Sequence, residues 1–256
     1  MATITDTDAY DTDTFNSLTY LRQYRSFECK YYKDILEDVH VLLKDIDLPD
    51  GTKQLDLGSG GSIHMTLSSS RKCCDITLSE FAIQNRELLK KWKDNNLAEF
   101  DWRESYEYIA DKENRSPKEI EDRARKAVKE IVKFNIYSEW PVVPDEDEKY
   151  NLVTSCLTLT AVCADFAAFK EAIARSASYL RSGGWIILVE IEKESKYDVG
   201  GVVFKVLPLK MSDVEDALAQ AGFEDITFRH HAHDVQNNFS DAEGHFTVRA
   251  RKSGKK

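Results

Sequence analysis

The sequence predicts an α/β fold built on a mostly parallel sheet. Residues 53–57 read as a short buried strand that is followed by glycines and then by a helical pattern from Ile63. Further along, residues 150–159 and 185–191 read as buried strands, and residues 166–180 read as a helix between them. Parallel strands need such a crossover connection, so this alternation is typical of a parallel sheet.

The chain before the first strand has a different character. Residues 1–14 repeat Thr and Asp, and we expect them to be disordered. Within residues 15–50 apolar side chains recur at steps of three and four, which predicts amphipathic helices that cap the sheet. We expect residues 51–252 to form the sheet core with insertions and residues 253–256 a tail, so 15–252 make one domain.

The middle of the chain is densely charged. Residues 73–78 read as the second strand, and a helical pattern starts at Phe81. Residues 117–133 are expected to form a helix because Pro117 follows Ser116, and residues 134–136 a short third strand or its exit.

The last part departs from a plain alternation of strands and helices. The Gly-Gly pair at 183–184 is expected to end the helix before it in a left-handed cap. Residues 197–209 suggest an added extended segment or hairpin, and residues 212–221 suggest a helix. Residues 226–231 and 245–251 alternate as two final strands, which favours an antiparallel edge.

Composition excludes several classes of function. The formal net charge of −10 argues against nucleic-acid binding, and no apolar run is long enough for a membrane span. The five cysteines form no C-x-x-C pair, which favours reduced thiols and a cytoplasmic protein. His230, His231 and His233 cluster, but histidines at a strand end are more often surface residues than ligands, so no metal is expected.

The glycine loop at 54–62 indicates a nucleotide-like ligand. Gly58, Gly60 and Gly61 lack the third glycine of a dinucleotide fingerprint, which disfavours a dehydrogenase. Asp56-x-Gly58-x-Gly60 instead matches the first motif of S-adenosylmethionine-dependent methyltransferases. Glu80 follows the second strand, 22 residues beyond Gly58, where an acid can reach ribose hydroxyls; it could also cap the next helix.

Further short stretches occur in a recognisable order: Tyr20 to Tyr24, Asp56 to Gly60, Gln84 and Asn85, Phe100 to Trp102, Cys163 to Asp165, Gly183 and Gly184, Leu207 to Leu209, and Glu243 and Gly244. In these stretches the chain resembles the family of nicotinamide, phenylethanolamine and thioether or indolethylamine N-methyltransferases, from about residue 20 to residue 252. The resemblance implies a class I Rossmann-like methyltransferase fold, with a seven-stranded, mostly parallel sheet, an antiparallel C-terminal edge and N-terminal cap helices. It also implies S-adenosyl-L-methionine as cofactor. We expect the protein to be a monomer.

The resemblance assigns the cofactor contacts to Tyr20, Asp56, Gly58, Ser59, Gly60, Ser62, His64, Glu80, Asn85, Asn135, Ile136 and Cys156. Periodicity by itself favours a core role for Tyr20 and Tyr24, whereas the family places the first of them over the cofactor. Several positions depart from the family: Glu80 and Asn135 each replace an aspartate, Arg25 replaces a tyrosine, and Cys156 replaces a threonine.

Two carboxylates are the candidate catalytic residues. Glu190 and Glu194 lie four residues apart at the end of a predicted strand, where they could orient an amine and balance its developing charge; an exposed strand end is the alternative. By resemblance, Glu190 matches an aspartate of the nicotinamide enzymes and Glu194 a glutamate of the phenylethanolamine enzymes. The predicted substrate contacts are Tyr20, Tyr24, Thr160, Tyr197 and Asp241.

The expected function is N-methylation of a small-molecule amine or pyridine nitrogen by direct in-line transfer. The alternative is a non-enzymatic ligand-binding module that retains the methyltransferase fold. The acceptor stays open, because Thr160 and Val206 differ from their counterparts and leave a pocket of mixed character.

Overall fold

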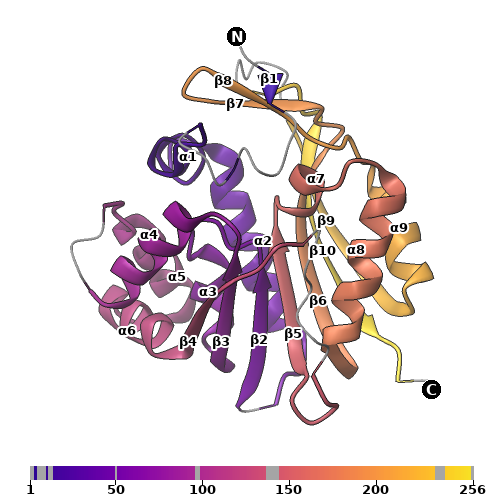
Figure 1. Ribbon diagram of the computed structural model, residues 1–256. Helices are drawn as coiled ribbons and strands as arrows, with labels where there is room; N and C mark the ends of the chain where they lie inside the picture. Colours follow the sequence, from indigo (N-terminus) through magenta and orange to yellow (C-terminus); the bar gives the residue numbers. More distant parts are fainter. Residues whose placement is uncertain are drawn as a thin grey trace.

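A twisted seven-stranded sheet forms the centre of the molecule (Figure 1). The computed structural model describes residues 3–4, 10, 14–49, 51–95, 99–136, 144–233 and 240–254. The strand order is β4-β3-β2-β5-β6-β10-β9. In chain order the strands are β2 Thr52–Leu57, β3 Cys73–Glu80, β4 Val128–Lys133, β5 Tyr150–Cys156, β6 Leu180–Glu192, β9 Phe223–Ala232 and β10 Gly244–Lys252.

The direction of the strands brings several strand ends together. All pairs from β4 to β6 are parallel, whereas β10 runs antiparallel to both β6 and β9. This confirms the mostly parallel sheet with an antiparallel C-terminal edge. The residues that follow β2, β3, β4 and β5 therefore meet at one edge, which is the upper one in Figure 1.

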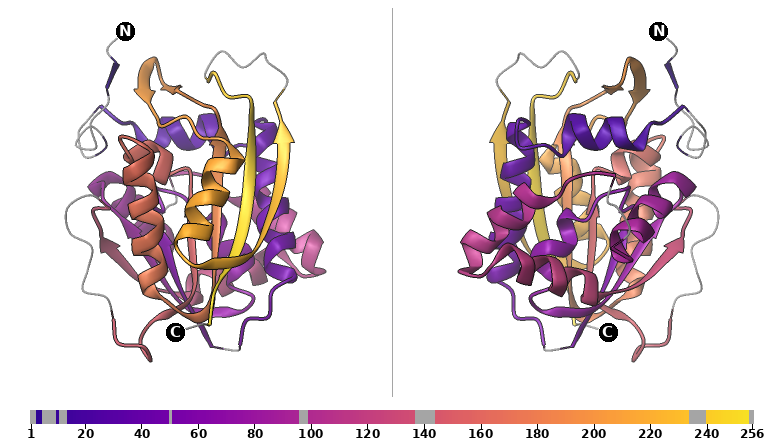
Figure 2. Two further views of the ribbon diagram at one scale, coloured as in Figure 1. Left: turned by 90° about the vertical axis from the view of Figure 1, so that its right-hand side faces the viewer. Right: turned by 90° about the vertical axis from the view of Figure 1, so that its left-hand side faces the viewer.

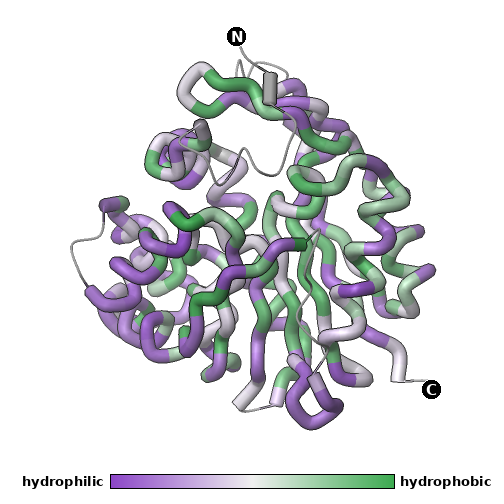
Figure 3. Tube along the Cα trace, in the orientation of Figure 1, coloured by the Kyte–Doolittle hydropathy of each residue, from purple (hydrophilic) through white to green (hydrophobic). Residues whose placement is uncertain are grey.

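Helices cover both faces of the sheet, and each face has its own apolar core. Alternate residues divide between the two cores: Ile187 and Val189 point to one, and Ile186 and Leu188 to the other. Figure 3 shows the central strands as largely hydrophobic and the outer helices as mixed. One face carries α2 Lys30–Lys44, α3 His64–Ser69, α4 Ile83–Lys93, α5 Arg103–Glu113 and α6 Pro117–Ala127; the other carries α7 Leu159–Val162, α8 Phe166–Tyr179 and α9 Met211–Gln220.

A small cap lies above the upper edge of the sheet (Figure 2). It consists of α1 Ser17–Tyr24 and a three-stranded sheet of β1 Thr3–Ile4, β8 Val202–Lys205 and β7 Lys196–Val199. The hairpin turns at Gly200 and Gly201, both with positive φ, as a tight hairpin requires. The expected N-terminal helices and hairpin are thus present. Most of residues 1–14, predicted to be disordered, lie outside the described residues.

One predicted helix extends too far. Residues 117–133 were expected to be helical, but α6 ends at Ala127 and the chain continues as β4, parallel to β3. Lys129 and Glu130 are exposed because β4 is the edge strand. Their charges interrupt the apolar pattern by which a buried strand is recognised in the sequence. Residues 134–136 then form the exit of the third strand. Helix α5 was not expected, although Tyr106 and Ile109 mark its buried side at a helical step.

Two boundaries near β5 and β6 also differ from expectation. The strand predicted over 150–159 ends at Cys156, because Leu157 adopts a φ of 57° and turns the chain toward α7. The predicted glycine cap at 183–184 is wrong. Leu180 already has extended backbone angles, and Gly183, with a φ of 76°, makes an irregularity inside β6 where the pairing register with β5 shifts.

Candidate active site

The loop after β2 approaches its surroundings closely at one glycine and faces open space at another. Gly58 has a φ of 65°, and a Cβ there would lie 2.1 Å from Cγ2 of Thr158. Gly60 has a φ of 61°, but a Cβ there would meet no atom within 4 Å. The backbone N–H of Ser59 donates to the carbonyl of Ser79, which ties the loop to β3. The two glycines therefore serve different needs, packing at Gly58 and an open edge at Gly60.

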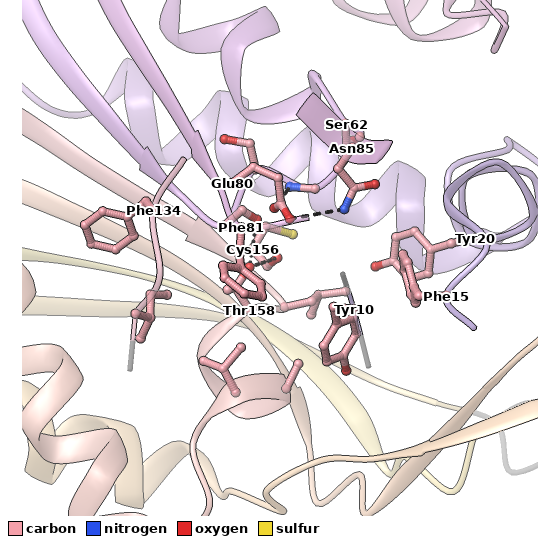
Figure 4. A pocket seen from close by; sticks show the side chains of 18 of the residues that line it. Tyr10, Phe15, Tyr20, Ser62, Glu80, Phe81, Asn85, Phe134, Cys156 and Thr158 are labelled. Carbon is pink, nitrogen blue, oxygen red and sulfur yellow. Dashed lines mark hydrogen bonds between the residues drawn. The ribbon is translucent and has the colours of Figure 1, made fainter. Parts of the chain in front are cut away.

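Glu80, the last residue of β3, holds the loop and the next helix together. One carboxylate oxygen accepts from the backbone N–H of Gly60 at 2.8 Å. The other accepts from the backbone of Ala82 at 2.8 Å and from the side chain of Asn85 at 3.2 Å (Figure 4). Burial raises the pKa of Glu80, while these donors lower it. Glu80 thus anchors the residue that precedes α4 and a side chain of its first turn, and it keeps acceptor capacity beyond these three bonds.

A cavity of about 100 Å³ opens above the glycine loop. Figure 4 shows Tyr20, Phe15 and Tyr10 on one side of it and Phe134 at the other end. Eleven of the predicted cofactor residues line it, namely Tyr20, Gly58, Ser59, Gly60, Ser62, His64, Glu80, Asn85, Asn135, Ile136 and Cys156. The cavity therefore brings together residues from five separate segments of the chain. We name it the loop pocket.

Asp56 is the predicted cofactor residue that does not line the loop pocket. Its side chain is buried in the sheet, where one oxygen accepts from the hydroxyl of Thr154 on the neighbouring strand at 2.5 Å. Burial raises the pKa of Asp56 to about 6. Its contact with a cofactor stays a prediction.

Arg25 brings a buried positive charge to the loop pocket. Its guanidinium donates to the Tyr20 hydroxyl at 3.0 Å and lies 5.2 Å from the centre of that ring. It also donates to the carbonyl of Tyr24 at 3.0 Å and lies 5.8 Å from the Tyr32 ring. The salt bridges among the described residues do not include Arg25. Aromatic faces and neutral acceptors therefore hold this cation in place of a carboxylate.

Two more polar groups of the loop pocket lie beside α3. The Ser62 hydroxyl and His64 Nδ1 are 2.6 Å apart. Burial and the nearby Arg25 charge keep the pKa of His64 well below its usual range, so the imidazole is neutral. Burial raises the pKa of Cys156 to about 12, so this residue presents a thiol and not a thiolate.

A second cavity, of about 240 Å³, adjoins the first one and shares Tyr20, Leu157 and Tyr197 with it. We name it the acidic pocket, because Glu194 and Asp241 line it. The predicted substrate residues Tyr20, Tyr24, Thr160, Tyr197 and Asp241 all lie along its wall. The structure therefore brings together the five residues that the sequence proposed for the substrate.

The two candidate catalytic glutamates have different surroundings. Glu194 lines the acidic pocket and accepts from the Ser240 hydroxyl, and burial raises its pKa to about 7. Glu190 is fully buried behind the pocket wall and accepts from the Thr160 hydroxyl at 2.7 Å. Burial raises the pKa of Glu190 to about 8, so it is mostly protonated at pH 7. Glu194 lies where a ligand could contact it directly, whereas Glu190 is joined to the pocket wall by its hydrogen bond with Thr160.

The rim of the acidic pocket is fixed by hydrogen bonds from the cap. The Tyr24 hydroxyl donates to the carbonyl of Asp198 at 2.7 Å, which joins α1 to β7. Asp241 accepts from the backbone N–H groups of Ser195 and Lys196 at 2.8 and 3.2 Å. These backbone bonds occupy part of the acceptor capacity of Asp241, so fewer of its lone pairs are available to a ligand.

Several lining residues were not foreseen as site residues. Phe81 and Phe134 follow β3 and β4 directly, so their place at the carboxyl edge was a usable signal. Tyr10 lay in a stretch expected to be disordered and carried no signal. His233, Ser240 and Tyr31 line the acidic pocket, although the histidine had been expected at the surface.

The described residues contain one group with possible metal-ligand geometry, Asp34, His231 and His245, which lies behind the acidic pocket. None of the helices in the described part of the chain is both long and apolar enough to cross a membrane.

Known proteins resemble the chain over nearly its whole length. Residues 2–253 match the sequence profile of the NNMT/PNMT/TEMT family. The nicotinamide N-methyltransferase of Sus scrofa is 30% identical over 97% of this chain and 96% of its own length. The indolethylamine N-methyltransferase of Oryctolagus cuniculus is 30% identical over 80% of this chain and 81% of its own length.

Solved structures confirm the fold at much lower identity. The magnesium protoporphyrin IX methyltransferase of Synechocystis PCC 6803, solved with bound SAH, is 13% identical and gives a TM-score of 0.61 over 96% of this chain and 97% of that one. A SAM-dependent methyltransferase of Methanosarcina mazei gives 0.58 at 14% identity, over 84% and 98%. The fold is thus that of a class I methyltransferase, and the chain belongs to the NNMT/PNMT/TEMT family of S-adenosylmethionine-dependent N-methyltransferases.

Proposed function

We propose that this protein transfers the methyl group of S-adenosylmethionine to the nitrogen of a small-molecule amine or pyridine, with an amine preferred. The observation that carries the proposal is the junction of the two cavities, which share Tyr20, Leu157 and Tyr197. One cavity has the loop and ribose acid of the family, and the other has a carboxylate that can face a cation. A methyl donor and an amine could therefore meet at the shared wall.

The residues of the loop pocket fit the cofactor. Within the described residues, the buried Arg25 Nε and His64 Nε2 have no hydrogen-bond partner, so both can serve a polar ligand. Arg25 would neutralise the carboxylate of the methionine part, and Glu80 would accept from ribose hydroxyls. The open space above Gly60 would let the ligand approach the backbone.

The chain's own groups would position the acceptor and exclude water. When bound, the cofactor supplies a methyl group on a sulfonium that is open to displacement. Glu194, as a carboxylate, would accept a hydrogen bond from an N–H group of the amine and balance the positive charge of the amine. Glu190, largely protonated, would hold Thr160 in place at the wall. Phe15, Phe204 and Tyr24 belong to one apolar cluster in the cap, which would shield the junction from solvent.

The preference for an amine over a pyridine as acceptor follows from the charge of Glu194. A carboxylate with a pKa of about 7 is about half ionised at neutral pH, and an ammonium beside it would favour the ionised form. A neutral pyridine gains less binding energy from this carboxylate, because it carries no positive charge before transfer and meets the carboxylate as a cation only in the transition state. An amine acceptor is therefore the better match.

A two-step experiment tests this proposal. Calorimetry measures binding of S-adenosylmethionine, and mass spectrometry then looks for methylated products in a panel of primary amines, secondary amines and pyridines. We expect binding and at least one N-methylated amine. A chain that binds the cofactor but methylates nothing in the panel would favour the ligand-binding module. A cytoplasmic location and a monomeric state stay predictions.

A further inference from the structure

A line of titratable side chains leads away from the acidic pocket on the side of β9 and β10. It begins at His233, which lines the pocket, and passes to His245, which is 1% exposed. It ends at Asp34 and His231, whose side chains are 25% and 30% exposed. The line therefore connects the inside of the pocket with the protein surface.

The atoms along this line are suitably placed for proton transfer. His233 Nε2 and His245 Nδ1 are 2.8 Å apart, which is a hydrogen bond. His245 Nε2 lies 3.9 Å from an oxygen of Asp34, which is close enough for an ion pair when the imidazole is protonated. An imidazole accepts a proton at one ring nitrogen and releases it from the other, so His245 can pass a proton from His233 toward Asp34.

The fold fixes the position of His245. It pairs across the sheet with His231 on β9 and with Ile191 on β6. The rings of His245 and His231 stack at 4.8 Å, and the Tyr31 ring on α2 lies 5.9 Å away. The charged and titratable groups that face it are thus Asp34 and Tyr31 from α2, and His231 and His233 from the β9 side.

The outer end of the line is also held. His231 Nε2 lies 2.9 Å from an oxygen of Asp38, and the other oxygen of Asp38 accepts from Arg229. His231 Nδ1 lies 3.8 Å from Asp34. These contacts keep the second histidine and the acid together at the half-exposed end, where a proton can leave to water.

We propose that His233, His245 and Asp34 form a proton exit path that makes an ammonium substrate reactive. The inference rests on the proposed function. A protonated amine has no lone pair, so one proton must leave before transfer. The N–H bond breaks and its electron pair stays on nitrogen; the proton passes through His233 and His245 to Asp34 and then to water.

The bonds made and broken in the reaction show which substrates need the proton path. The freed lone pair forms the new N–CH₃ bond, and the electron pair of the broken S–CH₃ bond stays on sulfur. A neutral pyridine has no proton to lose, so its turnover does not need the path. The ratio of amine to pyridine turnover therefore reports on the path separately from cofactor binding and folding.

The test compares variants by that ratio. His245→Asn can keep the hydrogen bond to His233 but cannot relay a proton, and His233→Ala opens the pocket end. We expect His245→Asn to lower the amine-to-pyridine ratio of kcat/KM by ~10-fold or more at pH 7. The loss should shrink as the pH approaches the pKa of the amine, and added imidazole should restore amine turnover in His233→Ala. His230→Asn is the matched control, because His230 pairs with Glu192 outside this line.

Several results would overturn the path. An unchanged ratio in His245→Asn at every pH would do so, as would a wild-type enzyme that methylates pyridines and no amine, although that result leaves the N-methyltransferase function intact. Loss of activity with a chelator and its recovery with Zn²⁺ would show that Asp34, His231 and His245 bind metal instead. A chain that methylates nothing would refute the proposed function, and the path with it.

Discussion

The loop pocket and the acidic pocket share a wall, yet their polar groups differ in kind. In the loop pocket the backbone of Gly58 and Gly60 shapes the cavity, and Glu80 is tied by three hydrogen bonds. In the acidic pocket Glu194 has a pKa near 7, and His233 leads to further titratable groups. A cavity fixed by backbone suits one constant ligand. A cavity that holds a carboxylate can distinguish a charged amine from a neutral acceptor, and its charge changes near neutral pH.

The glycines give the largest expected effects. Gly58→Ala should lower the free energy of unfolding by about 2–4 kcal/mol, because the new Cβ strikes Thr158 and the φ is positive. Gly60→Ala should cost only about 1 kcal/mol of stability but weaken cofactor binding by roughly 100-fold, because its Cβ enters the open cavity. Denaturant unfolding and calorimetry measure the two quantities.

Gly51→Ala is the matched control for the loop. Gly51 also has a positive φ and no atom within 4 Å, but it lies outside both pockets. Equal loss of cofactor affinity in Gly51→Ala and Gly60→Ala would mean that backbone strain, and not the shape of the cavity, controls binding.

Replacing Arg25 tests whether the loop pocket holds its ligand through a buried positive charge. Arg25→Met should weaken cofactor binding by about 10- to 100-fold, because a charge-assisted hydrogen bond is lost. The same change should leave the melting temperature equal or higher, because it removes a buried cation that has no salt bridge among the described residues. Arg22→Met, on the exposed side of α1, is the control. Weaker folding with unchanged affinity would make Arg25 a structural residue only.

Glu194 tests the acidic pocket itself. Glu194→Gln should lower kcat/KM for amines by about tenfold, with a smaller change for pyridines. For the wild type, kcat/KM for amines should rise with pH up to about 7 as the carboxylate ionises, and the variant should lack this step. Glu192→Gln, at the end of β6 and outside the pocket, is the control. An identical pH profile in Glu194→Gln would remove the residue from the mechanism.

Glu190 gives the smallest effect on turnover and a distinct effect on stability. Its folded pKa of about 8 lies above its ordinary value of 4.5, so the folded state binds the extra proton between these values. Its contribution to stability is therefore full below about pH 4.5 and is lost as the pH rises through 8, at about 1.4 kcal/mol per unit of pKa difference. Glu190→Gln should flatten this pH dependence, as measured by denaturant unfolding from pH 5 to 8. A steeper slope in the variant would contradict the raised pKa.

The same difference between the pockets explains what the sequence could predict. The loop pocket follows from contiguous signals, because Gly58, Gly60 and Glu80 stand at the ends of strands whose order the fold determines. The acidic pocket was predicted less completely. Thr160, Tyr197 and Asp241 were proposed from the resemblance and do line it, whereas His233, which directly follows β9, was expected at the surface.

Local pattern also failed where tertiary context decided the outcome. Residues 128–133 carry the charges of a solvated helix but pair with β3 at the edge of the sheet. Gly183 has the positive φ that a helix cap needs, yet it lies inside β6. Asp56 stands in the motif, but its side chain turns into the sheet toward Thr154. In each case the residue type was informative, but the outcome depended on a neighbouring strand that is distant in the sequence.

The most direct test of the account uses S-adenosylmethionine that carries a deuterated methyl group. The protein is incubated with an equal mixture of a primary amine and a pyridine, and the products are identified by mass spectrometry. We predict a deuteromethyl group on the amine nitrogen, in greater yield than on the pyridine, and, at limiting cofactor concentration, a large drop in both products in Gly60→Ala but not in Gly51→Ala. Cofactor binding without any deuteromethylated product, or equal loss in both variants, would contradict the central claim that the two joined pockets carry out N-methyl transfer.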